Sequence, residues 1–269
     1  RKAVWVLDRP NPAGRPVEGL LLDAGWESFV GAGAMPMRHG LTIGEMARWF
    51  VATLKLDVEL RVIEMQGWDP SAAPGYGWPL HERSWVNPSP NAPNLSMVRC
   101  YAGTVMIEGT TLSEGRGTTR PLELVGAPRF DALATLKWVE KFSPQWLAGC
   151  TPRVCWFEPT FHKHVGELCD GIQLHVDAPA YQQAHFRPWR LIAAILKAQL
   201  ALQPERVLWR DFPYEYELQR LAFDVINGGA RLRQWIEDQR ASAADLDALT
   251  ETEERAWREA RAAAELYRG

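Results

Sequence analysis

The sequence predicts an α/β protein in which two unequal domains are joined by a proline-rich crossing. Residues 4–65 give an apolar strand, an amphipathic helix and a second strand, which is the order found in open α/β sheets. Residues 67–93 carry six of the 19 prolines and are too long for an ordinary connection. The second half mixes strands and helices. We therefore predict the end of a Rossmann-like domain at residues 1–83, a proline-rich crossing at 84–97 and a smaller α+β domain at 98–269.

The first strand is expected at residues 4–8, where a buried apolar run is ended by the prolines that follow it. Its carboxyl end carries Asp8, Arg9 and Asn11. Ligands gather at that end of the strands in open α/β sheets, so these side chains are candidate ligand contacts. A plain Asx turn before proline is the alternative. Because a domain rarely begins on an interior strand, we expect further sequence before it.

The first helix is predicted to begin at a capping box formed by Thr42 and Glu45, and to run to about Lys55. The box explains Glu45 without any ligand. Arg38 and His39 lie just before this helix N-terminus, where unpaired N–H groups attract anions, so they are the better ligand candidates.

The remaining elements follow from apolar periodicity and turn residues. Strands are expected at 60–65, 104–107, 122–125, 153–157 and 172–176, and helices at 132–141, 188–202, 215–226, 230–239 and 253–267.

A glycine-rich stretch, residues 108–117, directly follows the apolar run at 104–107 and carries Glu108, Glu114 and Arg116. Glycine allows close approach of a ligand to the backbone, and loops at strand ends often carry functional side chains. This stretch is therefore a candidate site of chemistry. The alternative is a tight turn with a structural Glu–Arg pair.

Composition and charge exclude two classes of partner. The formal net charge is −3 and no basic tract occurs, which argues against a nucleic-acid surface. The longest apolar region, 191–202, is interrupted by Lys197 and Gln199, so no membrane span is expected. The 13 tryptophans are compatible with stacking on a sugar as well as with ordinary cores.

Several short motifs occur in one order along the chain and together resemble the bacterial exo-β-N-acetylmuramidases of the NamZ type. The resemblance runs from about Val4 to Trp257. Its motifs are Val6–Pro12, Pro36–Glu45, Pro88–Asn91, Glu108–Thr118, Gly126–Pro128, Pro159–Phe161, Cys169–Gly171 and His175–Val176.

This resemblance implies a Rossmann-like N-terminal domain, a smaller C-terminal domain and an active site in the cleft between them. It further implies removal of N-acetylmuramic acid from the non-reducing end of peptidoglycan fragments, with no cofactor. It also implies a catalytic glutamate in a Glu-His-Gly segment that this chain lacks. Thr111 stands where the family usually has Asn, and His162 where Ser is common. Since peptidoglycan lies outside the membrane, an extracytoplasmic location is favoured.

Glycoside hydrolysis normally uses two carboxyl groups that flank the bond. Glu108 and Glu114 are the best candidates for catalytic residues in this chain. Arg116 beside Glu114 predicts that Glu114 stays ionised, and Glu108, after an apolar run, is predicted to be the acid with a raised pKa. If the substrate's 2-acetamido group is the nucleophile, one protein acid–base suffices. If the absent glutamate is the main catalyst, both become supporting groups.

The lactyl carboxylate of muramic acid calls for a guanidinium, an imidazole or a helix N-terminus. Internal ion pairing is the alternative role for the arginines. The predicted substrate-binding set is Asp8, Arg9, Asn11, Arg38, His39, Arg116 and His175.

Two other functions stay open at this point. His162, His164, Cys169 and His175 could hold zinc for a metal-dependent hydrolase, although no standard ligand spacing is present and we assign no metal. A non-catalytic module that binds peptidoglycan sugars is the second alternative.

Overall fold

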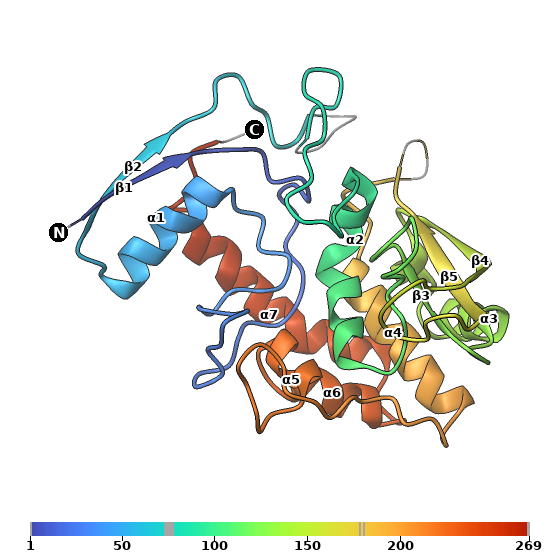
Figure 1. Cartoon of the computed structure of the whole chain (residues 1–269). Helices are drawn as coiled ribbons and strands as arrows, with labels where there is room; N and C mark the ends of the chain where they lie inside the picture. The colour runs from blue at the N-terminus through green and yellow to red at the C-terminus, as the bar shows by residue number, and fades with distance from the viewer. Residues whose placement is uncertain (1, 73–77, 178, 180, 268–269) are drawn as a thin grey trace.

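The computed structural model describes residues 2–72, 78–177, 179 and 181–267, and it confirms the α/β class. Figure 1 shows a small sheet at the N-terminal side and a second sheet on the far side of the molecule, with helices between them. Part of the predicted loop, residues 73–77, lies outside the described residues. The domain boundaries at 83 and 97 stay a prediction.

The small sheet contains the parallel strands β1 (Lys2–Leu7) and β2 (Val58–Ile63), with α1 (Ile43–Leu54) packed against both strands. The predicted strand at the start of the chain is therefore present, but the prediction that it is buried is wrong. Trp5 is 56% and Leu7 69% exposed. Within the described residues the strand pairs with β2 alone, and apolar sequence by itself does not reveal whether a second layer covers it.

Helix α1 begins as predicted. The Thr42 hydroxyl accepts from the Glu45 amide at 3.2 Å, and the Glu45 carboxylate accepts from the Thr42 amide at 2.8 Å. The helix ends at Lys55, which takes a left-handed conformation.

The strand predicted at 104–107 is wrong. These residues end α2 (Leu95–Thr104), which Asn94 caps, and continue into the 3₁₀ helix η1 (Val105–Gly109). Met106 and Ile107 have no exposed surface, so the run is buried as expected. A short buried apolar run does not distinguish helix from strand.

The second sheet is antiparallel, in the order β3 (Leu124–Ala127), β5 (Cys169–His175) and β4 (Thr151–Phe157). Helix α3 (Ala132–Phe142) and the 3₁₀ helix η2 (Pro144–Leu147) connect β3 to β4. Helix α4 (Pro188–Leu202) is buried on every side from Pro188 to Gln199, and it packs against α2, α3 and α6. A helix that is buried on every side is expected to lie at the centre of a core.

The chain ends with α5 (Ala222–Asn227), α6 (Arg231–Glu237) and α7 (Ala243–Arg261). The helix predicted at 215–226 is mostly wrong, because Glu215 and Tyr216 have φ of 46° and 72° and no helix forms before residue 222. Helix α7 begins ten residues before its predicted start at 253, at a second capping box made by Ser242 and Asp245.

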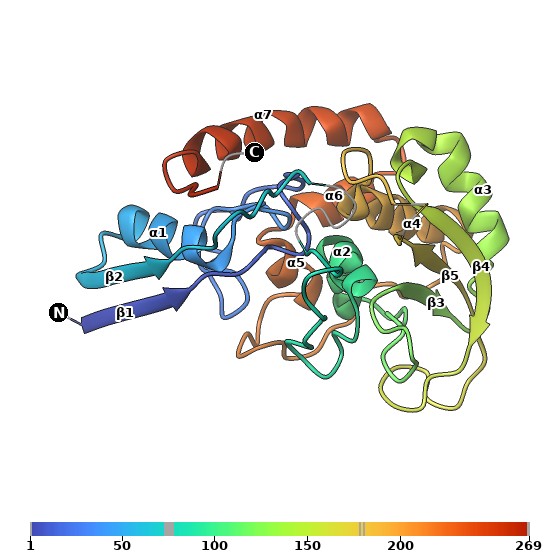
Figure 2. The same ribbon diagram turned by 90° about the horizontal axis from the view of Figure 1, so that it is seen from above.

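Helix α7 runs along one side of the molecule toward α1 (Figure 2), so the C-terminal part of the chain packs against the N-terminal part. Its Trp257 indole packs on Trp49 of α1 and donates to the carbonyl of His39 at 2.8 Å. Among the described residues we find no helix with the length and apolar content needed to cross a membrane.

Candidate active site

A cavity of about 420 Å³ opens beside the glycine-rich stretch. Glu108 lies on η1 and Arg116 on the loop that follows it, and both of these predicted site residues line the cavity. The other walls come from the crossing, the β4–β5 loop and the segment between α4 and α5. They are Asn91, Phe161, His162, Arg210, Phe212, Pro213, Tyr214 and Glu215.

Arg116 bridges the two predicted catalytic glutamates. One of its terminal nitrogens forms an ion pair with Glu108, and its Nε lies 3.2 Å from Oε1 of Glu114. The second oxygen of Glu108 accepts a hydrogen bond from the Tyr214 hydroxyl at 2.9 Å. Burial, and then the charge of Glu108, raise the pKa of Tyr214, so the phenol keeps its proton and remains a donor. Glu108 is thus held at the cavity by a cation and a phenol.

Glu114 has no exposed side-chain surface and lies behind the cavity wall. Its Oε2 is 2.7 Å from the Lys163 ammonium, and its Oε1 is 3.3 Å from Nδ1 of His162. Burial alone would raise the pKa of Glu114, but the His162 hydrogen bond and the Lys163 charge outweigh it and lower the pKa to about 2. Glu114 is therefore ionised at neutral pH, and it acts on the cavity through Arg116 and His162.

Lys163 holds the glycine-rich stretch in shape. Its ammonium donates to the carbonyls of Ile107, Thr110 and Leu112 at 2.9, 3.1 and 2.6 Å, while Glu114 supplies the balancing charge. Burial lowers the pKa of Lys163, and Glu114 opposes that change. Sequence reasoning missed this residue, because a lysine between two histidines has the appearance of an exposed turn.

Gly117 lets this stretch pack against the β4–β5 loop. It has φ of 84°, and a Cβ at this position would lie 2.6 Å from the carbonyl oxygen of Phe161. Its own carbonyl accepts from the amide of Thr160 at 2.9 Å. The glycine therefore satisfies both a backbone conformation and a close approach that other residues would disturb.

Two of the residues predicted at the end of β1, Asp8 and Asn11, form hydrogen bonds that hold the local backbone. The Asp8 carboxylate accepts from the Gly44 amide at 2.8 Å, the Thr42 hydroxyl at 2.7 Å and the Tyr267 hydroxyl at 2.8 Å. Asn11 forms the Asx turn that was the alternative, accepting from the Ala13 amide at 2.9 Å.

Arg9 is exposed and lines neither the cavity beside the glycine-rich stretch nor the one at the end of β1 described below.

Arg38 and His39 do not offer the exposed cations that anion binding needs, which corrects the prediction for both. Arg38 is 2% exposed and donates to the carbonyls of Phe186 at 2.9 Å and Ala13 at 3.1 Å. Burial, and then the nearby Arg261, lower the pKa of His39 to about 4, so the imidazole is neutral at pH 7. Its Nδ1 accepts from the Leu41 amide.

The four donors of the metal hypothesis point to separate partners. His162 faces Glu114, His164 contacts the carbonyl of Thr111, and the Cys169 thiol donates to the carbonyl of Glu167. His175, also a predicted substrate contact, accepts from Arg153 on the neighbouring strand at 3.2 Å. In the described part of the chain no three His, Cys, Asp or Glu side chains are placed to share a metal ion. The four side chains named for the metal-dependent alternative are therefore not placed to bind one metal ion together.

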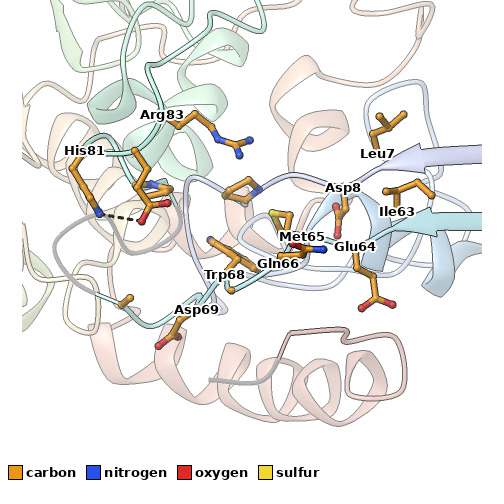
Figure 3. Close-up of a pocket in the computed structure, with 15 residues that line it drawn as sticks. Leu7, Asp8, Ile63, Glu64, Met65, Gln66, Trp68, Asp69, His81 and Arg83 are labelled. Carbon is orange, nitrogen blue, oxygen red and sulfur yellow. Dashed lines mark ion pairs between the residues drawn. The ribbon is translucent and has the colours of Figure 1, made fainter.

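A second cavity, also about 420 Å³, lies at the carboxyl ends of β1 and β2, where ligands were expected (Figure 3). Asp8 lines it, but Arg9 and Asn11 do not. The loop at 67–93 contributes Trp68, Asp69 and His81 to this cavity and Asn91 to the other, so its described residues do border possible binding surfaces. That the site lies between two domains stays a prediction.

Comparison with known proteins gives consistent matches along the chain. The family model for the C-terminal part of the exo-β-N-acetylmuramidase NamZ matches residues 99–267, and the model for its N-terminal part matches residues 1–96. The peptidoglycan β-N-acetylmuramidase NamZ of Bacillus subtilis (strain 168) is 37% identical over 240 residues. That alignment covers 87% of this chain and 52% of the relative, so the chain spans about half of the relative's length.

Two crystal structures of DUF1343 family proteins from Bacteroides fragilis NCTC 9343 share the fold. Their TM-scores are 0.81 and 0.70, at 23% and 24% sequence identity. They cover 98% and 99% of this chain, which itself covers 66% of each.

Proposed function

The chain belongs to the NamZ family of exo-β-N-acetylmuramidases, and we propose that it is a glycoside hydrolase that removes N-acetylmuramic acid from the non-reducing ends of peptidoglycan fragments. The observation that carries this proposal is the cavity in which Glu108, Arg116 and Tyr214 meet. A volume of about 420 Å³ lies within the usual range of small-molecule sites and has room for a terminal sugar.

Glu108 is the residue proposed to exchange a proton with the substrate. It lines the cavity, and both of its oxygens already have hydrogen-bond donors that fix their direction. In this state it accepts hydrogen bonds, which is the role of a general base.

Glu114 is proposed as a supporting group. A carboxylate with a pKa of about 2 and no exposed surface is a poor proton donor and cannot touch a sugar in this conformation. What it does is hold Arg116 and His162 at the cavity wall.

The second carboxyl group in the cavity is Glu215, which sequence reasoning missed. It is exposed at the rim and follows directly on Tyr214. Two routes fit this arrangement: hydrolysis assisted by the substrate's own 2-acetamido group, with Glu108 as the single acid–base, or a second carboxyl group that completes the pair.

The test uses a chromogenic β-N-acetylmuramide, with the matching β-N-acetylglucosaminide as the substrate control. Glu108→Gln should lower kcat by about 10²–10⁴-fold, because the amide cannot exchange the proton. Glu140→Gln is the matched variant, since Glu140 is exposed on α3. Muramide cleavage that is unaffected by Glu108→Gln would remove Glu108 from the mechanism.

A further inference from the structure

Arg210 is a second arginine in the wall of the cavity that Glu108 and Arg116 line. Its position is fixed by backbone pairing, because its amide donates to the carbonyl of Gly109 at 3.0 Å and the preceding Trp209 pairs with Thr110. Its guanidinium lies over the ring of Phe212, 4.0 Å from the ring centroid. Stacking on an aromatic face holds the plane of a guanidinium and leaves its N–H edges free to bind.

The cations around the cavity differ in whether they already have a carboxylate partner. Arg116 is shared between Glu108 and Glu114, and the Lys163 ammonium also lies against Glu114. Among the described residues no carboxylate forms an ion pair with Arg210, although the exposed Glu215 lines the same cavity. An incoming anion would therefore compete with bound carboxylates at Arg116, whereas at Arg210 it meets no such competitor.

Resting on the proposed function, we propose that Arg210 binds the lactyl carboxylate of the terminal N-acetylmuramic acid and so selects that sugar over N-acetylglucosamine. The two sugars differ by the lactyl group that carries this carboxylate, and a stacked guanidinium offers the carboxylate two parallel N–H donors. Arg210 therefore replaces Arg38 and His39 as the proposed partner of the carboxylate. Arg38 is buried and donates to a backbone carbonyl, and His39 is a neutral imidazole.

The first test compares kcat/KM for the chromogenic muramide and glucosaminide in the full chain. Arg210→Gln should lower the muramide-to-glucosaminide ratio about tenfold or more, with most of the loss in KM for the muramide. Arg210→Lys should keep part of the preference, since it keeps the charge and loses the paired donors. Arg240→Gln is the control, because Arg240 is 96% exposed and far in sequence from the cavity walls. An unchanged ratio in Arg210→Gln overturns the proposal.

The second test measures equilibrium binding of N-acetylmuramic acid and of its methyl ester, which lacks the charge. The wild type should bind the acid about tenfold more tightly than the ester, and Arg210→Gln should bind the two alike. Thermal unfolding of each variant checks that it is folded.

The outcomes separate the two proposals. If the wild type binds the acid more tightly than the ester, Arg210→Gln binds the two alike and neither protein releases the sugar, the hydrolase is contradicted and the role of Arg210 is supported. Release that keeps its full preference in both Arg210 variants contradicts the role of Arg210 and supports the hydrolase.

Discussion

The cavity at the glycine-rich stretch and the cavity at the ends of β1 and β2 both contain polar residues from conspicuous motifs, yet those residues do different work. In the first, Glu108 and Arg116 reach the cavity while Glu114 and Lys163 support them from behind. In the second, Asp8 is occupied by the helix N-terminus and by Tyr267. Polar motif residues become available to a ligand only where other residues satisfy the backbone around them.

The largest expected effect comes from removing the support behind the first cavity. Lys163→Met should destabilise the fold by about 3–5 kcal/mol, because it leaves the Glu114 carboxylate buried without its ammonium and removes one donor from each of three carbonyls. Urea unfolding measures this, and the exposed Lys137→Met should change stability by less than about 0.5 kcal/mol. Adding Glu114→Gln to Lys163→Met should recover part of the loss. A Lys163→Met variant as stable as wild type would show that this support is not needed.

Acid should weaken the contacts between Glu114 and its cationic neighbours, and the pKa of Glu114 sets how much free energy of unfolding is lost. The folded-state pKa of about 2 lies below the ordinary value of 4.5, so the unfolded chain binds the proton more readily. The contribution, about 3 kcal/mol, is fully present above about pH 5 and is lost as the pH falls toward 2. The difference in unfolding free energy between wild type and Glu114→Gln, followed from pH 6 to pH 2, should shrink by about this amount. A constant difference would mean that Glu114 is not held ionised by its neighbours.

The second region should respond less, and through stability alone. Asp8→Ala and Thr42→Ala remove the two ends of one 2.7 Å hydrogen bond at the start of α1. A double-mutant cycle on unfolding free energies should give a coupling of about 1 kcal/mol. Additive effects would argue that Asp8 does not cap the helix through Thr42 and is free for another role.

How much of this fold the sequence predicts depends on how local the signal is. The capping box of Thr42 and Glu45 and the long apolar pattern of 188–202 are complete within a few turns, and both helices form as predicted. The apolar run at 104–107 has no cap or long apolar period of its own, and it continues the helix that begins at Leu95. Residues 215–221 have helical composition, but Glu215 and Tyr216 have positive φ and no helix forms before residue 222.

The candidate site was predictable only in part for a related reason. Glu108 and Arg116 are neighbours in the sequence, and glycines mark their loop. Tyr214 and Arg210 reach the same cavity from a segment about a hundred residues away, and no local pattern connects them to it. Arg38 failed as a ligand because its guanidinium, which the sequence presents as free, is buried and donates to the carbonyls of Phe186 and Ala13.

Glu108, held by Arg116 and Tyr214, is proposed to take part in cleavage of a terminal N-acetylmuramic acid. Mass spectrometry of a peptidoglycan disaccharide with N-acetylmuramic acid at its non-reducing end, incubated with wild type and with Glu108→Gln, tests it most directly. We predict that wild type releases the free amino sugar and that Glu108→Gln leaves the disaccharide intact over the same time. An intact disaccharide with wild type, or equal release by both proteins, would contradict the claim.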